Sequence, residues 1–198
     1  MSGAPVLDRD PFRVFQTWLD EAARAGLEMP EAATLATATP DGKPSARLIL
    51  HKGVRDGGFL FVTNYASRKA AELDANPHAA LVFHWARLER QVRIEGRAAR
   101  APRAVSHEYF ATRPRESQIG AWASPQSARI DDRESLDRRV GELEREYAGR
   151  DIPCPDFWGG YILTPESFEF WIGQRGRLHD RFLYERDGAA WKMSRLAP

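Results

Sequence analysis

Three Asp-Gly pairs, at residues 41–42, 56–57 and 187–188, place the strongest constraint on how this chain can fold. Asp-Gly favours a tight reversal between antiparallel strands, because both residues tolerate a positive φ. The segments between the turns are short and rich in apolar and β-branched residues, as strands are. We therefore expect strands at residues 33–39, 45–52, 59–64, 78–85 and 88–100, and three more from residue 159 onward. Such a succession predicts a mainly β fold, an antiparallel barrel or sandwich.

Helical patterns flank these strands. Asp10-Pro11 is typical of a helix start, and apolar residues at helical spacing follow as far as Gly26. Ser67 is suited to cap a short helix, and further helices are expected at residues 101–124 and 132–147. A chain of 198 residues is long enough for one good core. We expect a short tail, residues 1–9, and a single domain, residues 10–198.

Charge and composition limit the classes of partner that the protein can bind. The chain has 29 Lys and Arg against 28 Asp and Glu, so its net charge of +1 gives no global field to attract nucleic acid or anionic lipid. The apolar runs are shorter than a membrane span, and the N-terminus lacks the pattern of a signal peptide. We expect a cytoplasmic protein with no membrane contact. One cysteine and five scattered histidines predict neither an intramolecular disulfide nor a metal site.

A cationic stretch lies close to the C-terminus, in WIGQRGRLHDR (residues 171–181). If residues 177–181 are extended, Arg177, His179 and Arg181 point to one face, because side chains alternate along a strand. Three nitrogen-bearing side chains on one face suit a planar, anionic ligand. The alternative is a polar face on an edge strand.

Two further groups suit a phosphate. Arg68 and Lys69 open a short helix, where backbone N–H groups and the helix dipole favour anions. Tyr109 and Arg113 lie four residues apart, and Pro114 bends the chain so that Ser117 returns to the same side; Lys52 from a neighbouring strand would complete a clamp for a phosphomonoester. The alternatives are a solvated helix start for the first group and an ordinary amphipathic helix for the second.

Several motifs carry a resemblance when they are taken together and in order. They are SRKAAEL, LERQVRIEG, YFATRPRESQIGAWAS, FWGGY and RLHDRFLYER, the last followed by WKMSRLAP. From about Asp10 to the C-terminus the sequence resembles the pyridoxamine (pyridoxine) 5′-phosphate oxidase family of flavin enzymes. The resemblance implies an FMN-binding split β-barrel of the Greek-key antiparallel type. It also implies a homodimer that oxidises pyridoxamine and pyridoxine 5′-phosphates with O₂ to pyridoxal 5′-phosphate and hydrogen peroxide.

The resemblance also implies roles for particular residues, some of them supplied by the second subunit. Arg177 and His179 would act on the substrate ring as catalytic residues. The substrate phosphate would be bound by Lys52, Tyr109, Arg113 and Ser117. The FMN would be bound by Arg47, Leu48, Ile49, Leu50, His51, Lys52, Val62, Thr63, Arg68, Lys69, Gln91, Gln126, Ser127, Trp171 and Arg181.

The sequence departs from the family pattern at three of its motif positions. His51 stands where an aliphatic residue is usual, Val62 where tyrosine is frequent, and Ile172 where glutamine is common. Only nine residues precede Asp10, and none is the tyrosine of the segment that folds over the substrate in many members. Two alternatives follow: a related flavin oxidase acting on another aromatic metabolite such as a dihydrophenazine, or a non-catalytic protein that binds flavin or pyridoxal phosphate.

Overall fold

The computed structural model describes residues 7–198, so the first six residues of the expected tail lie outside the described part. Within residues 7–198, five α-helices and nine strands follow one another with two short 3₁₀ turns, η1 and η2. Their order is α1 (Pro11–Arg24), β1 (Ala32–Ala38), β2 (Pro44–Leu50), β3 (Val54–Arg55), β4 (Gly58–Asn64), α2 (Arg68–Ala75), β5 (His78–Trp85), η1 (Ala86–Leu88), β6 (Arg90–Arg100), α3 (Arg103–Ala111), α4 (Arg115–Ala123), α5 (Arg133–Glu146), β7 (Trp158–Ile172), η2 (Arg175–Arg177), β8 (Asp180–Asp187) and β9 (Ala190–Leu196).

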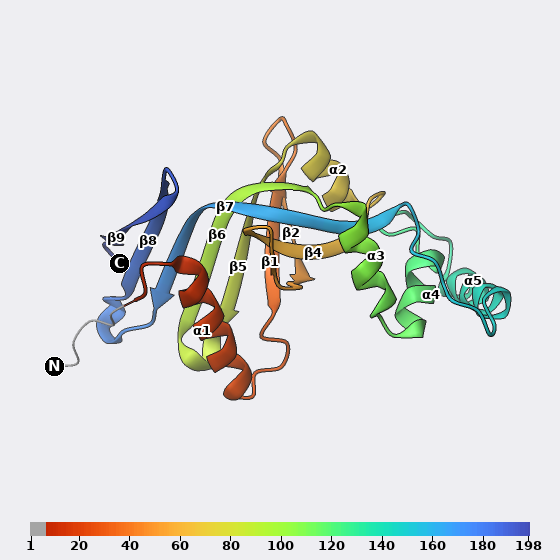
Figure 1. Ribbon diagram of the computed structural model, residues 1–198, viewed down its shortest axis with the longest axis horizontal. Coiled ribbons are helices and arrows are strands. Elements are labelled where there is room, and N and C mark those ends of the chain that lie inside the picture. The colour runs from red at the N-terminus through yellow and green to blue at the C-terminus, as the bar shows by residue number, and fades with distance from the viewer. Residues whose placement is uncertain (1–6) are drawn as a thin grey trace.

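The described strands form one antiparallel sheet whose main path runs β2-β1-β5-β6-β7-β4-β3, and β8, which pairs with β7, carries β9 at its other edge. The long strand β7 organises it: residues 158–163 pair with β4, residues 167–172 pair with β8, and β6 runs along the other edge. Figure 1 shows β7 running from the helices α3–α5 at one end to the β8–β9 hairpin at the other. Among the described residues the path ends at β2 and β3 without closing into a ring. This confirms the expected mainly β architecture, a split barrel with flanking helices.

The Asp-Gly turns lie where the sequence predicts them. Asp56 and Gly57 have φ of 53° and 71° between β3 and β4, as a two-residue hairpin turn requires. Gly42, in the loop between β1 and β2, has a φ of 83°, and Ala38 lies opposite Pro44 at the base of that hairpin. The strand expected from residue 88 begins two residues later, because Ala86–Leu88 forms a 3₁₀ turn that ends at Glu89 with a φ of 51°.

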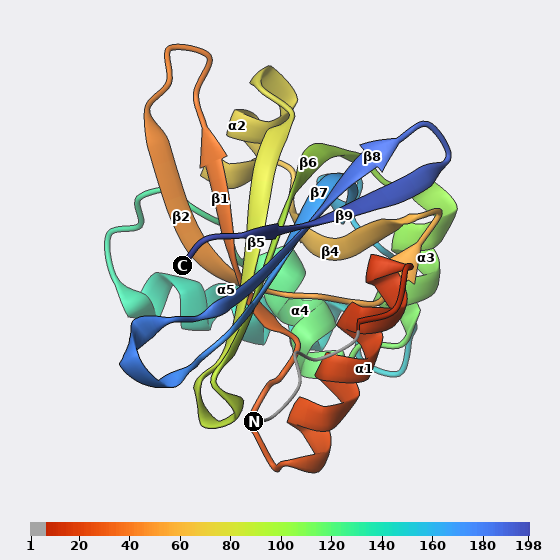
Figure 2. The same cartoon turned by 90° about the vertical axis from the view of Figure 1, so that its left-hand side faces the viewer.

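Helix α1 buries one face in the main core, and Figure 2 shows the helix lying alongside the strands. The Asp10 carboxylate accepts a hydrogen bond from the Phe12 amide, and Pro11 occupies the first turn, so the predicted start is confirmed. Phe15 and Trp18 are buried against aromatic residues of β4, β5 and β7. Among residues 7–198, no helix combines the length and apolar character needed to cross a bilayer.

A second, smaller core lies under α3, α4 and α5. Phe110, Ile119 and Leu143 from these three helices pack with Trp158 at the start of β7. Val62 of β4 packs against this cluster, so α3 and α4 lie beside β4, which pairs with the same end of β7. This arrangement leaves a cavity between the barrel and the helices.

Candidate functional site

The cavity between the barrel and the α3–α4 helices has a volume of about 390 Å³. Strands β2 and β4 form one wall, and the end of α3 and the start of α4 form the other. It is lined by Leu48, Ile49, Leu50, Lys52, Val62, Thr63, Lys69, Tyr109, Thr112, Arg113, Pro114, Ser117 and Gln126. Most of the residues expected to bind cofactor or substrate phosphate therefore meet in one place.

The four residues expected to clamp a phosphate, Lys52, Tyr109, Arg113 and Ser117, all line this cavity. The Lys52 ammonium lies 5.8 Å from the centre of the Tyr109 ring, and the Arg113 guanidinium stacks 4.7 Å from the centre of the Trp158 ring. Pro114 precedes the first residue of α4, so the predicted bend is confirmed.

Arg113 is the most informative of these residues. Its Nη1 atom is buried and has no hydrogen-bond partner within residues 7–198. Burial lowers the pKa of Arg113, because the charged form loses its hydration. A buried guanidinium nitrogen without a partner is costly, and an anion in the cavity would satisfy it.

A second cationic group lies at the Lys69 side of the same cavity. The Lys69 Nζ atom donates to Thr63 Oγ1 at 3.0 Å, to Ser67 Oγ at 3.4 Å and to Gln126 Oε1 at 3.4 Å. Burial, and then the charge of Arg47, lowers the pKa of Lys69. Burial destabilises the charged form of this lysine, and a negative charge placed nearby would stabilise it.

Ser67 corrects one sequence prediction. Its backbone is extended at the N-cap position of α2, but its side chain makes no capping hydrogen bond. The hydroxyl instead lies in a buried contact with Thr63 Oγ1, 3.3 Å away, and accepts from Lys69. Tertiary packing thus turns the expected cap toward the barrel.

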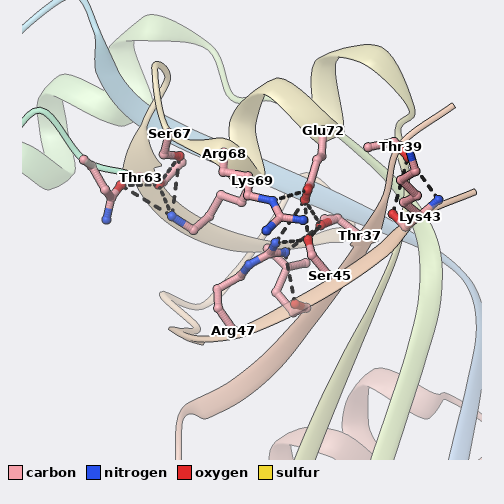
Figure 3. A network of polar contacts seen from close by, with 12 residues as sticks. Thr37, Thr39, Lys43, Ser45, Arg47, Thr63, Ser67, Arg68, Lys69 and Glu72 are labelled. Atoms are coloured by element: carbon pink, nitrogen blue, oxygen red, sulfur yellow. Dashed lines mark hydrogen bonds and ion pairs between the residues drawn. The ribbon is translucent and has the colours of Figure 1, made fainter. Parts of the chain in front are cut away.

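Arg47 and Arg68 flank the Lys69 group and both bind Glu72, as Figure 3 shows. Glu72 is 5% exposed and had no role in the sequence prediction. One signal was available: Arg68 and Glu72 lie four residues apart in a helix, the spacing at which opposite charges pair. Thr37 and Ser45, which also bind Glu72, carried no such signal because β1 and β2 lie far away in sequence.

The remaining expected residues gather elsewhere. Gln91 lies opposite Trp171 on neighbouring strands, Trp171 lies opposite Arg181, and the Trp171 and His179 ring centres are 4.6 Å apart. None of these residues lines the cavity, and neither does Arg177. Trp158 and Trp171 mark the two ends of β7, up to about 40 Å apart at the rise of an extended strand. The two groups of expected site residues therefore lie at opposite ends of β7 and line no common cavity in the described chain.

The predicted alternation of Arg177, His179 and Arg181 on one strand face is wrong. Arg175–Arg177 forms a 3₁₀ turn, Gly176 and Arg177 have φ of 68° and 62°, and β8 begins only at Asp180. The physical reason is that the chain must reverse from β7 to β8, which needs left-handed residues here. His179 Nδ1 accepts a hydrogen bond from the backbone N–H of Gln174. Arg181 donates to Glu169, from Nε to Oε1 at 2.9 Å and from Nη2 to Oε2 at 3.1 Å.

Four more of the expected cofactor residues lie outside the cavity lining: Arg47 and Arg68, which bind Glu72, and His51 and Ser127. His51 is 5% exposed and packs among the rings of Phe15, Phe59 and Phe83 in the main core. Its backbone is the part of the residue beside the cavity-lining Leu50 and Lys52. Ser127 is exposed with a φ of 72°, next to Gln126, whose side chain does line the cavity.

Comparison with known proteins identifies the family. Residues 19–145 match the family described as pyridoxamine 5′-phosphate oxidase, and residues 158–198 match the pyridoxine 5′-phosphate oxidase C-terminal dimerisation region. The chain is 57% identical to the pyridoxine/pyridoxamine 5′-phosphate oxidase of Rubrobacter xylanophilus over 191 residues, which covers 96% of this chain and 88% of that protein. The corresponding protein of Psychromonas ingrahamii is 52% identical, with 96% and 87% covered.

Solved structures agree with this assignment. The crystal structure of PhzG from Burkholderia lata 383, in complex with tetrahydrophenazine-1-carboxylic acid, has a TM-score of 0.91 at 34% identity and covers 96% of this chain and 94% of that one. A related FMN-binding protein from Nostoc punctiforme has a TM-score of 0.76 at 19% identity, covers 97% of this chain and 100% of that one, and supports the fold alone. Sequence, fold and matched regions together show that this chain belongs to the pyridoxamine 5′-phosphate oxidase family of oxidoreductases.

Proposed function

We propose that this protein oxidises pyridoxamine 5′-phosphate and pyridoxine 5′-phosphate with O₂, using FMN, to pyridoxal 5′-phosphate and hydrogen peroxide. With the amine substrate, water is consumed and ammonia is released. The observation that carries the proposal is one cavity with cationic groups at two places, Lys69 in one and Lys52 with Arg113 in the other. Two such groups suit the two phosphoryl groups of a flavin mononucleotide and a phosphorylated vitamer.

The residues on the Lys69 side fit the FMN phosphate. Arg47, Arg68 and Lys69 carry three positive charges against the single negative charge of Glu72. A phosphomonoester carries about −1.5 to −2 at pH 7, which complements that excess. The β2 stretch 47–52, Val62, Thr63 and Gln126 would hold the rest of the cofactor, with Ser127 beside them. Bound FMN supplies the two-electron oxidation, so the protein needs no nucleophile of its own.

The residues on the Arg113 side would orient the substrate. Arg113 Nη1, the Tyr109 and Ser117 hydroxyls and the Lys52 ammonium can all donate hydrogen bonds to a phosphate. Binding the phosphate at a fixed point would hold the pyridine ring in one pose within the cavity. Orientation of this kind accounts for a large share of the acceleration in a reaction whose electron chemistry belongs to the cofactor.

We propose further that the catalytic site is completed by a second copy of the chain. Arg177, His179, Trp171, Gln91 and Arg181 lie at the far end of β7 from the cavity. The match of residues 158–198 to a dimerisation region supports a homodimer in which each subunit contributes this end of β7 to its partner's cavity. His179 and Arg177 would then bind the ring and its phenolate oxygen. We place the protein in the cytoplasm, since its single cysteine permits no intramolecular disulfide.

One assay tests the reaction. The purified protein is examined for a flavin absorption spectrum, and peroxide and aldehyde are measured with pyridoxamine 5′-phosphate and with unphosphorylated pyridoxamine. We expect a yellow protein that turns over the phosphorylated amine with a kcat/KM at least 100-fold higher, because charge-assisted hydrogen bonds to the phosphate contribute about 1.5–3 kcal/mol each. A colourless protein that takes up no FMN would refute the proposal.

A second candidate function is oxidation of a dihydrophenazine, which the likeness to the Burkholderia lata structure favours. The phosphate clamp argues against this function. A phenazine carboxylate does not need four hydrogen-bond donors, which here are Lys52, Tyr109, Arg113 and Ser117. The same peroxide assay with a dihydrophenazine carboxylate distinguishes the two. A non-catalytic flavin carrier would bind FMN and form no peroxide with either compound.

A further inference from the structure

Glu72 is a buried carboxylate at the centre of a polar network that links three elements. It lies on α2, is 5% exposed, and accepts hydrogen bonds from four side chains on β1, β2 and α2. Figure 3 shows these contacts converging on its two oxygens. The donors are Thr37 Oγ1 at 2.5 Å, Ser45 Oγ at 2.6 Å, Arg47 Nη2 at 3.0 Å and Arg68 Nε at 2.8 Å.

The carboxylate stays charged at physiological pH. Burial alone would raise the pKa of Glu72, but hydrogen bonds from Ser45, Thr37, Arg68 and Arg47 outweigh burial and hold the pKa at about 2. A permanent negative charge beside a phosphate site would repel the phosphate. Such a charge is compatible with the site when it binds and orients the cations that contact the phosphate. Glu72 forms ion pairs with two guanidinium groups, which indicates that it orients them.

The two guanidiniums are held differently. The terminal nitrogens of Arg47 are occupied within the protein, by the Leu35 carbonyl, Thr37, Ser45 and Glu72. Arg68 contacts Glu72 through Nε, and its terminal nitrogens make no hydrogen bond within residues 7–198. The Arg68 side chain is 66% exposed. Glu72 therefore fixes the inner edge of Arg68 and leaves the outer N–H groups free to bind an anion.

We propose that Glu72 is a positioning residue for the FMN phosphate: it does not contact the phosphate but, together with the Arg47 that it binds, holds Arg68 in the orientation in which the terminal N–H groups of Arg68 bind the phosphate. This inference rests on the proposed function, because it takes FMN as the anion. A fixed guanidinium loses less conformational entropy when it binds than a free one does, so its hydrogen bonds contribute more to affinity. Glu72 also sets the excess charge of the group at a value that one phosphate neutralises.

The test compares FMN with riboflavin, which lacks the phosphate. Dissociation constants of both flavins are measured by fluorescence titration for wild-type protein and for Glu72→Gln. An amide keeps the shape of the side chain but accepts at one atom only, so one guanidinium loses its anchor. We expect FMN to bind about tenfold more weakly and riboflavin to change less than twofold, a loss of orientation that is specific to the phosphate.

Asp74→Asn is the matched control. Asp74 lies on the same helix, and its carboxylate also binds an arginine, Arg100, together with the Tyr161 hydroxyl, but it does not contact Arg47 or Arg68. We expect unchanged FMN affinity for this variant. Equal weakening of FMN and riboflavin by Glu72→Gln would assign Glu72 to structure alone, and unchanged or tighter FMN binding would make it a mere counter-charge; either result overturns the inference.

A second variant covers failure of Glu72→Gln to fold. Thr37→Val conserves volume and charge but removes one donor to Glu72 and one acceptor for Arg47. We expect about a threefold loss of FMN affinity with riboflavin unchanged, and an unchanged FMN affinity would overturn the inference. Wild-type protein that binds neither flavin would instead refute the proposed function, so the two failures are distinguishable.

Discussion

His51 and Arg113 each have a buried side-chain nitrogen without a hydrogen-bond partner among residues 7–198. Such atoms are uncommon in folded proteins, because the lost hydration of a polar atom is not replaced. Arg113 faces a cavity where a ligand can supply the partner. His51 is enclosed by aromatic rings, so no ligand can reach its buried nitrogen. The same local defect therefore indicates function at one residue and a cost to stability at the other.

His51 makes stability depend on pH. Burial lowers the pKa of His51 from 6.5 to about 4. The Leu60 backbone has a smaller, raising effect on this pKa, the charge of Lys52 lowers it, and the charge of Glu31 raises it. Between these values the unfolded chain binds a proton that the folded chain does not, so stability is present above pH 6.5 and is lost as pH falls toward 4. Replacing His51 by Leu removes this loss.

We therefore expect His51→Leu to stabilise the protein by about 2 kcal/mol more at pH 5 than at pH 7.5. Urea unfolding at the two pH values measures the difference. His84→Leu, at an exposed histidine on β5, is the control and leaves the pH dependence of the wild type in place. An identical effect of His51→Leu at both pH values would contradict the assignment.

Arg113 is expected to act on the substrate and not on the cofactor. Arg113→Met keeps an unbranched side chain against Trp158 and removes the charge, so we expect the KM for pyridoxamine 5′-phosphate to rise about 10- to 100-fold. FMN affinity should be unchanged. Arg115→Met is the control, because Arg115 donates to the carbonyls of Tyr147 and Arg150 and lies outside the cavity lining. A parallel loss of FMN would contradict separate phosphate sites.

Strands β6 and β7 are the longest neighbouring pair in the sheet, and their pairing is irregular at one point. A bulge between Glu95 and Gly96 shifts the register of these strands. A β-carbon at Gly96 would lie 2.1 Å from the Thr164 carbonyl oxygen, which is backbone and cannot move aside like a side chain. The bulge bends the long strands, and the two halves of β7 then serve different neighbours, β4 and β8.

Gly96→Ala is therefore expected to destabilise the protein by about 3 kcal/mol, because the strands must separate to admit the methyl group. Gly120→Ala is the matched control, since nothing lies within 4 Å of a β-carbon at that helical position. That variant should be neutral or stabilise by up to about 1 kcal/mol. Denaturant unfolding compares the two, and equal effects would show that the close approach is not maintained in solution.

At the scale of the whole molecule, the cavity and the Arg177–His179 turn belong to opposite ends of β7. If two subunits exchange these ends, an Arg113→Met subunit and an Arg177→Ala subunit complement each other. A mixed dimer then has one site with both changes and one site with neither. Arg177→Ala alone should slow turnover far more than it weakens FMN binding.

Co-expression of the two variants is expected to restore about a quarter of wild-type activity, because about half of randomly assembled dimers are mixed and each has one intact site. Peroxide formation by the co-purified mixture measures this, with each single variant as the control. Activity no greater than that of the single variants would show that both residues serve the same subunit's site.

The sequence determined what local interactions control. The Asp-Gly turns, the Asp10 cap of α1 and the strands they bound are set by backbone preferences of a few adjacent residues, and the order of motifs was enough to identify the family. The sequence also named Tyr109, Arg113 and Ser117 as one group, because helical spacing and a proline bend are local. It was wrong about residues 177–179, where the reversal into β8 prevailed over the expected alternation.

Which groups share a site depends on packing between elements that are distant in sequence. The pairing of β4 with the first half of β7, about a hundred residues apart, brings Val62 and Thr63 beside Arg113, which lies about fifty residues away in sequence; no local pattern encodes either contact. The same packing buries Glu72 between Arg47 and Arg68 and turns Ser67 away from its capping role. Burial and charge pairing depend on all neighbours at once, which is why these features required the folded chain.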